Sequence, residues 1–237
     1  DYAEIAKKLD ECEQVLCIAS TKKEAEKIFE LLDGEAMYLS TNLCPAHRRE
    51  IIREMKTRLR DGKACRVVST SIISVGVDID FPVVYLQYTG LDSLIQGAGR
   101  CNREGRQSLQ HSRAHIFWTK ESKKSPFMRK EKQVTDMVRE KYNAEEMTEP
   151  SAIRTYFENW YQSNEGNLDY KEIEKLAQSL SFAEIGKRFH LISDSTKSVF
   201  IPFDEKARNI KEQLMMGNRS RQLMRAAGPY MIHVRYS

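Results

Sequence analysis

Hydrophobic residues in the first half of the chain follow two alternating patterns. Short continuous apolar runs are typical of strands that are buried on both faces. Residues 15–19 form such a run, and further strands are predicted at residues 36–39, 66–69, 83–86 and 114–118. The segments between them carry apolar residues at helical spacing, most clearly from Pro45 to the stop at Gly62. Strands that alternate with crossover helices predict an α/β fold over residues 1–120, with a parallel sheet and flanking helices.

The pattern changes after Trp118. Helical spacing recurs over about residues 127–142, 150–162, 169–180 and 204–216. Residues 190–192 and 198–201 read as a β-hairpin around a polar turn, and residues 230–236 alternate as a final strand. We therefore expect residues 121–237 to form a helical linker and a small, mostly helical α+β accessory region with a β-hairpin. The basic stretch from Lys120 to Lys132 fits a solvated linker or a contact with DNA.

Composition excludes a membrane protein and a secreted disulfide-rich domain. Charged residues make up 30% of the 237 residues, and no apolar run reaches the roughly 18 residues that a spanning helix needs. The first residues, Asp1-Tyr2-Ala3-Glu4, lack the basic and apolar regions of a signal peptide. They also lack an initiator Met, which fits a processed chain or a piece of a longer one.

Cysteine and histidine spacing gives no sign of a metal site. The five cysteines never form a C-x-x-C pair, and the five histidines have no ligand spacing. This usage predicts reduced thiols, a cytoplasmic protein and no metal bound by the chain itself. The net charge of +4 permits nucleic-acid binding without requiring it.

The segment from Gln96 to Arg103 is the strongest candidate for chemistry. Arg100 and Arg103 are three residues apart, so on the helix predicted from Asp92 to Arg103 they would share a face. Two adjacent guanidinium groups repel each other unless an anion lies between them, and a nucleotide phosphate suits their planar geometry. Glycines such as Gly99 leave room for a ligand to approach. A solvated basic helix end is the alternative for such an arginine pair.

A second candidate segment runs from Ser69 to Asp80, directly after a buried strand. Functional loops of parallel sheets lie at the carboxyl ends of the strands. Hydroxyl and backbone N–H groups there can hold a phosphate. Gly76 permits a tight turn, and Asp78 can accept from a ribose hydroxyl or an arginine. Taken alone, the segment is also typical of an ordinary loop with an aspartate cap.

Together these two segments resemble motifs V and VI of superfamily 2 helicases, in the same order and spacing. Three stretches point to a more specific family within this superfamily: STNLCPAHRR at 40–49, GVDIDFPVV at 76–84, and GLDS at 90–93 leading into QGAGRCNREG at 96–105. They are similar to the helicase lobe of the CRISPR-associated helicase-nuclease of type I systems. DEAD-box relatives have His and Arg where this chain has Gln96 and Gly97. The resemblance is dense over residues 15–120 and weaker beyond.

The resemblance implies a RecA-like second motor lobe and roles for particular residues on the nucleotide side. Arg100 and Arg103 would be arginine fingers, both exposed at a cleft surface, that reach the γ-phosphate of ATP held by the first RecA-like lobe. Gly76, Asp78 and Gly99 would line the ATP cleft, and Gln96 would contact the nucleotide or couple it to the DNA strand.

The resemblance also implies contacts with single-stranded DNA. Thr41, Arg48 and Thr70 would hold backbone phosphates, and Ser20-Thr21 matches the region of motif IV, so that Thr21 joins them. The expected partners are the DNA strand, the first lobe, the HD nuclease domain of the full-length protein, and the CRISPR surveillance complex. No membrane partner is implied.

Motifs of the first lobe do not occur in this chain. There is no G-x-x-x-x-G-K-[ST] loop, and Asp10-Glu11-Cys12-Glu13 imitates an acidic box without following an apolar strand. No His is followed by Asp, so the HD nuclease motif is also missing. We therefore expect Mg²⁺ to be bound by the first lobe, and the fragment alone to be inactive toward ATP.

The leading interpretation is an ATP-dependent translocase lobe that acts in CRISPR interference. Two alternatives remain open. One is the lobe of another superfamily 2 DNA helicase, from restriction or repair. The other is a non-enzymatic fragment that binds a partner protein.

Overall fold

The computed structural model describes residues 1–237 except 75, 109, 120–124, 170, 190–195 and 236–237. The chain forms two compact units. The first comprises Asp1–Lys132 and Ser198–Ile232, and the second comprises Gln133–Lys197 with the residues from His233 onward. The region predicted as accessory, from residue 121 on, is therefore divided between both units.

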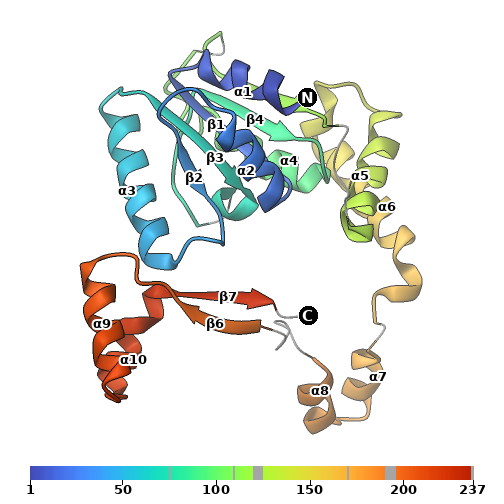
Figure 1. The fold of residues 1–237 in the computed structure, drawn as a ribbon. Helices are drawn as coiled ribbons and strands as arrows, with labels where there is room; N and C mark the ends of the chain where they lie inside the picture. The colour runs from blue at the N-terminus through green and yellow to red at the C-terminus, as the bar shows by residue number, and fades with distance from the viewer. Residues whose placement is uncertain (75, 109, 120–124, 170, 190–195, 236–237) are drawn as a thin grey trace. The chain divides into compact units, whose positions relative to one another are not determined.

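A parallel five-stranded sheet forms the centre of the first unit (Figure 1). In sheet order its strands are β2 (Met37–Leu39), β3 (Cys65–Thr70), β1 (Gln14–Ala19), β4 (Val83–Gln87) and β5 (Arg113–Phe117). All four pairings are parallel, with Leu16 opposite Val67 on one side of β1 and opposite Val84 on the other. The α/β fold with a parallel sheet that the hydrophobic pattern predicted is confirmed, and all five predicted strands are present.

Successive residues of β1 point to opposite faces of the sheet, so the strand is buried on both sides. Val15, Cys17 and Ala19 belong to the core cluster under helices α1 (Tyr2–Asp10) and α2 (Lys22–Glu30). Leu16 and Ile18 belong to the opposite cluster, which α3 (Pro45–Arg60) and α4 (Leu91–Ala98) cover with residues such as Met55 and Leu94. Helices therefore flank both faces.

A C-terminal segment packs against the N-terminal end of α3. It contains β6 (Thr196–Phe200), α9 (Glu205–Met215), α10 (Arg221–Ala227), the short 3₁₀ turn η4 (Gly228–Tyr230) and β7 (Met231–Arg235). Ala207, Ile210 and Tyr230 form a buried cluster with Cys44, which precedes α3. The Tyr230 hydroxyl donates to Asp204 Oδ2 at 3.0 Å, and Asp204 caps α9.

The two strands of the C-terminal segment pair with each other as a separate sheet, β6 with β7. The first strand of the predicted hairpin, residues 190–192, lies outside the described residues. The second strand of that hairpin is β6, and its partner is the predicted final strand rather than a sequence neighbour.

Short helices make up the second unit. They are the end of α5 (Pro126–Arg139), η2 (Glu146–Thr148), α6 (Pro150–Ser163), η3 (Glu165–Asn167), α7 (Ile173–Gln178) and α8 (Phe182–Arg188). Val134, Val138, Ala152 and Tyr156 are its buried hydrophobic residues on α5 and α6, and Thr135 is buried with them. Across both units, no described helix combines the length and the apolar character that a bilayer-spanning helix requires.

Gly97 allows α4 to lie close against β4. A Cβ atom at Gly97 would come within 2.5 Å of Leu86 Cδ2 and 3.4 Å of Ile18 Cδ1. Both neighbours belong to the buried core, so they have little room to move. The glycine is therefore required by packing rather than by backbone conformation.

We expect Gly97→Ala to lower the free energy of unfolding by about 1–3 kcal/mol, the usual cost of overpacking a core. Gly99→Ala is the matched control, because a Cβ there would meet nothing closer than 3.5 Å. Chemical denaturation of both variants measures the difference. Equal stabilities would contradict the close packing of α4 on β4.

Candidate functional site

The carboxyl ends of β1, β2 and β3 open onto a hydroxyl-lined hollow of about 500 Å³, here called the hydroxyl hollow. It is lined by Ser20, Thr21, Lys22, Thr41, Thr70, Ser71 and Ile72. Parallel strands place their carboxyl ends at one edge of a sheet, which is why three loops distant in sequence meet here. The structure thus brings together Thr21, Thr41 and Thr70, three of the four residues predicted to contact nucleic acid.

These three threonines differ in how available their hydroxyls are. Thr21 caps α2, where its Oγ1 accepts from Glu24 N at 3.2 Å and donates to Glu24 Oε2 at 2.8 Å. Thr70 is only 9% exposed. Thr41 is exposed. Thr41 therefore offers the most accessible hydroxyl, whereas Thr21 mainly fixes the helix start.

Arg48, the fourth predicted contact, lies in the first turn of α3 and does not line the hydroxyl hollow. It is half-buried. Its Nε is buried and has no hydrogen-bond partner among the described residues. Because an unpaired buried donor is costly, this guanidinium is well suited to bind an anionic ligand by donating a hydrogen bond to it.

A buried polar network underlies the edge of the sheet, and sequence reasoning missed it. Gln87, the last residue of β4, donates from Nε2 to Glu24 Oε1 at 2.6 Å, and its Oε1 accepts from Ser20 N at 2.7 Å. Nε2 also donates to Thr119 Oγ1 at 2.9 Å. Glu24 is 4% exposed. The network fixes the loop after β1 relative to β4 and to the end of β5.

Two signals in the sequence pointed toward this network. Thr21 and Glu24 have the T-x-x-E spacing of a capping box, and Gln87 is a polar residue at the end of an apolar run. Their partnership joins residues 63 positions apart, which local patterns do not reveal.

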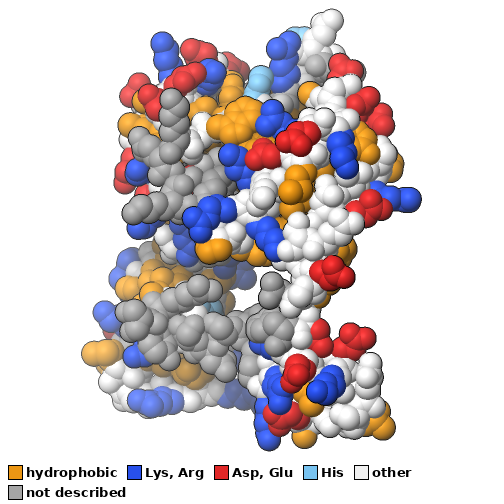
Figure 2. Space-filling model, turned by 90° about the vertical axis from the view of Figure 1, so that its right-hand side faces the viewer, with side chains coloured by type: hydrophobic (Ala, Val, Ile, Leu, Met, Phe, Trp, Pro, Cys, Tyr) orange, Lys and Arg blue, Asp and Glu red, His pale blue; other side chains and the backbone are white. Residues whose placement is uncertain are grey.

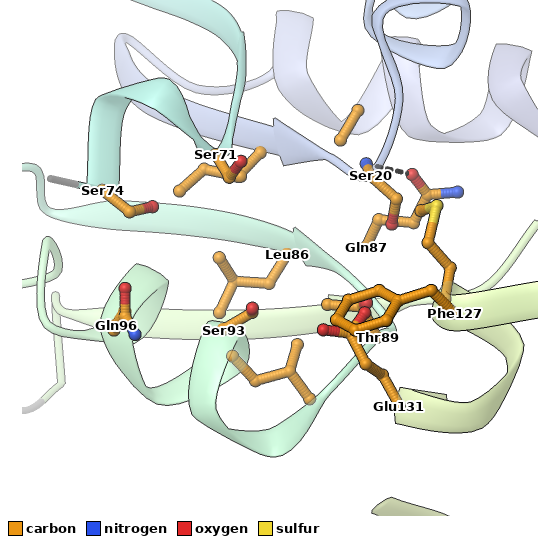
Figure 3. Close-up of a pocket in the computed structure, with 14 residues that line it drawn as sticks. Ser20, Ser71, Ser74, Leu86, Gln87, Thr89, Ser93, Gln96, Phe127 and Glu131 are labelled. Carbon is orange, nitrogen blue, oxygen red and sulfur yellow. Dashed lines mark hydrogen bonds between the residues drawn. The ribbon is translucent and has the colours of Figure 1, made fainter. Parts of the chain in front are cut away.

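A second hollow of about 220 Å³, here called the α4–α5 pocket, lies at the ends of β1 and β4 (Figure 3). Its polar lining includes Ser20, Ser71, Ser74, Thr89, Ser93 and Gln96. Its lining also includes the apolar residues Leu86, Phe127 and Met128, and Glu131. Gln96, predicted to contact the nucleotide or couple it to the DNA strand, is exposed and faces this pocket.

The segment with both arginines leaves the helix earlier than predicted. α4 ends at Ala98, and Gly99 is its C-cap, so Arg100 and Arg103 lie in the following turn instead of on a helical face. Asn102 has a positive φ of 45°, which is incompatible with a continued helix. The backbone then pairs with the loop before β4: Phe81 N donates to Arg100 O, and Asn102 N donates to Phe81 O, each at 2.9 Å.

Arg100 is buried, with 8% of its surface exposed; the prediction that both arginines are exposed is wrong for this residue. Its Nη1 donates to Val77 O at 2.7 Å and its Nη2 to Ser74 O at 2.5 Å. Burial lowers the pKa of its guanidinium, the neighbouring Arg103 lowers it further, and Asp78 opposes the shift. Arg100 thus closes the loop after the 3₁₀ turn η1 (Ser71–Ser74) by binding its carbonyl groups.

Arg103 is exposed, as predicted from the sequence. Its side chain is 44% exposed, and its Nε lies 3.3 Å from Asp78 Oδ1. Its backbone N–H donates to Asp80 Oδ1 at 2.7 Å, which holds the turn in place. An exposed ion pair contributes little stability. The guanidinium can therefore exchange Asp78 for an anionic ligand at low cost.

The glycines near these arginines leave the surface open. Gly76 has φ of 73°, and a Cβ there would meet nothing within 4 Å. Gly99 is exposed at the end of α4. A phosphate can approach this surface, and the buried Nε of Arg100, which has no described hydrogen-bond partner, fits an additional acceptor. Among the described residues, no group of three or more His, Cys, Asp or Glu is arranged to hold a metal ion.

Comparison with known proteins agrees with the family resemblance. Residues 11–106 match the model of the C-terminal region of the CRISPR-associated nuclease/helicase Cas3. The Cas3 protein of Methanothermobacter thermautotrophicus is 26% identical over 198 residues, covering 74% of this chain and 24% of its own length. The predicted resemblance to the CRISPR-associated helicase-nuclease is confirmed.

Solved structures share the fold. The crystal structure of T. fusca Cas3 with ATP has a TM-score of 0.62 at 15% identity, covering 99% of this chain and 33% of that protein. A chain of a CRISPR RNA-guided surveillance complex in a pre-nicking state has a TM-score of 0.56 at 14% identity, covering 100% of this chain and 36% of that one. The predicted RecA-like fold is confirmed. The chain spans about a third or less of the length of these relatives.

The two carbonyl contacts of Arg100 give a stability prediction. Arg100→Lys keeps the charge but loses the planar fork that reaches both Ser74 and Val77, so we expect the free energy of unfolding to fall by about 1–3 kcal/mol. Arg103→Lys, at an exposed pair, is the control and should change it by less than about 0.5 kcal/mol. Urea unfolding checks both, and an equal loss for the two variants would contradict the structural role of Arg100.

Proposed function

Starting from the match of residues 11–106 to the C-terminal region of Cas3, we propose that this chain is the second motor lobe of an ATP-dependent translocase of single-stranded DNA in CRISPR interference. The chain supplies arginine side chains to an ATP site and contacts to the DNA backbone. The observation that carries the proposal is the position of Arg103, an exposed guanidinium held in place by its own backbone and paired only with exposed Asp78 among the described residues.

Arg100 and Arg103 have different roles at the ATP site. Arg103 is the finger that reaches the γ-phosphate, where a guanidinium neutralises the charge that spreads over the transferred group. Arg100 binds the carbonyl groups of Ser74 and Val77, and its buried Nε has no hydrogen-bond partner among the described residues. In this account its catalytic contribution is largely to position Arg103 and Asp78.

The remaining cleft residues make space for the nucleotide or form polar contacts with it. Gly76 and Gly99 leave room for the nucleotide. Asp78 holds Arg103 in the open state, and on closure it releases Arg103 and accepts a hydrogen bond from the ribose. Gln96 lies between the nucleotide side and the DNA side, so it couples the two. ATP supplies the free energy of the cycle; its phosphate-binding loop and Mg²⁺ ligands belong to the first lobe.

The hydroxyl hollow is the DNA side of the lobe. Thr41, Thr70 and Lys22 offer hydroxyl and ammonium donors of the kind that hold backbone phosphates without reading sequence. Thr21 shapes the hollow by capping α2. Arg48 completes the anion-binding surface through its unpaired Nε.

The full-length protein is expected to combine this lobe with a first RecA-like lobe and an HD nuclease domain in the cytoplasm, and to act with a CRISPR surveillance complex. The solved complex with similar fold concerns another protein, so this partner belongs to the proposal. A lobe of a restriction or repair helicase is the alternative within motors; the presence of an HD motif upstream in the gene separates the two.

In the full-length protein, Arg103→Ala should lower ATP turnover by at least about a hundredfold while leaving ATP binding largely intact, because an arginine finger acts mainly in the transition state. The matched control is Arg106→Ala, which removes an arginine that is 77% exposed and paired with Glu104. Steady-state turnover and nucleotide affinity are measured for both. Near-normal turnover of Arg103→Ala would remove the finger assignment.

Arg48→Gln should weaken binding of single-stranded DNA for every sequence and lower the slope of log affinity against log salt by about 0.7, the value for one phosphate contact on a single strand. Arg60→Gln, which alters the 75% exposed end of the same helix, should leave the slope unchanged. Titrations at several salt concentrations measure it. A slope equal to that of the unmodified protein would argue against a phosphate contact by Arg48.

A further inference from the structure

The hydroxyl hollow and the α4–α5 pocket adjoin each other at the sheet edge. Ser20 and Ser71 line both of them. Ser20 is fixed by the bond from its N–H to Gln87, and Ser71 begins the 3₁₀ turn after β3. A strand whose backbone lies in the first hollow therefore passes directly beside the second.

The two hollows differ in chemistry. The described lining of the hydroxyl hollow contains Lys22 and hydroxyl groups but no carboxylate, which suits phosphate. The α4–α5 pocket has Glu131 at its lining and no lysine or arginine among its described residues. The rest of its lining consists of hydroxyl, amide and apolar groups, which offer no cation to a phosphate. The second pocket is therefore suited to a neutral ring system.

The size and the apolar walls of the α4–α5 pocket also favour a neutral ring system as its ligand. Its volume of about 220 Å³ equals that of roughly seven liquid waters, enough for one planar base and too small for a helix or strand of another protein. Leu86 and Leu94 supply an apolar wall. Gln87 also lines the pocket, but its amide is held by Ser20, Glu24 and Thr119, so it fixes the wall.

Phe127 lies in the first turn of α5 and is 60% exposed. Figure 3 shows its ring extending from α5 toward the side of the pocket that carries Thr89 and Ser93. A planar base entering the pocket would meet the ring of Phe127, and base–aromatic stacking is strong and independent of sequence. Ser93 and Gln96 bring a hydroxyl and an amide, which can turn to serve as donor or acceptor for any base edge.

We propose that the α4–α5 pocket receives one unstacked base of the translocated strand, stacked on Phe127, while the adjoining phosphates lie in the hydroxyl hollow. This site rests on the proposed DNA-binding function and adds a base contact to it. Because Gln96 also lies beside the turn with Arg100 and Arg103, an occupied base pocket is placed next to the ATP side of the lobe.

The test uses the full-length protein and oligothymidylate strands, either intact or with a single abasic site moved along the strand. The unmodified protein should lose about tenfold in affinity when the abasic site reaches one register, as expected from the loss of one stacked base. Phe127→Ala should lose a similar factor on the intact strand and show no further loss at any register. Phe127→Trp should restore the register dependence.

Two controls separate stacking from other effects. Phe127→Ala should leave the salt slope unchanged, since no phosphate contact is removed. Phe157→Ala, at a 41% exposed position on α6, should bind like the unmodified protein. Thermal unfolding confirms that each variant is folded.

The proposal is overturned if Phe127→Ala binds intact and abasic strands as the unmodified protein does. It is also overturned if the variant binds all strands more weakly by the same factor and with a lower salt slope, because that result indicates a backbone contact. A fall in ATP turnover at unchanged DNA affinity would overturn it as well, because that result indicates a contact with the first lobe. If Arg48→Gln still lowers the salt slope in the first case, the DNA-binding function stands and only the base site falls.

Discussion

The guanidinium of Arg100, bonded to the carbonyls of Ser74 and Val77, connects the two loops on which the proposed ATP site depends. One loop follows β3 and carries Gly76 and Asp78; the other follows α4 and carries Arg103. The pairing of Phe81 with Arg100 and Asn102 adds two backbone bonds between the same regions. Because the connection is buried, Arg103 extends from a fixed base while its own side chain remains exposed.

At the edge of the sheet, too, buried residues hold the backbone in place while exposed residues are available to a ligand. Gln87 and Glu24 form a buried pair that fixes Ser20 and the start of α2, and the accessible hydroxyl of Thr41 lies at the surface beside them. Lys22 lies in the hydroxyl hollow, whereas the described lining of the α4–α5 pocket contains no lysine or arginine. A backbone track and a base site can therefore lie side by side on one small lobe.

The central sheet was predictable because strands buried on both faces must be apolar throughout, as Val15 to Ala19 are. The grouping of Thr21, Thr41 and Thr70 followed from the rule that parallel strands end at one edge. The burial of Arg100 was not predictable, because its acceptors are carbonyl groups 23 and 26 residues away, and backbone groups carry no sequence signal. The pairing of β6 with β7 likewise joins segments that no local turn connects.

The central claim is that Arg103 leaves Asp78 to bind the γ-phosphate when the lobes close. A structure of the full-length protein with single-stranded DNA and ADP–aluminium fluoride, a mimic of the transferred phosphoryl group, tests it most directly. We expect the Arg103 guanidinium to lie about 3 Å from the fluoride atoms and Arg100 to keep its bonds to Ser74 and Val77. An Arg103 still paired with Asp78, with the mimic held entirely by other groups, would contradict it.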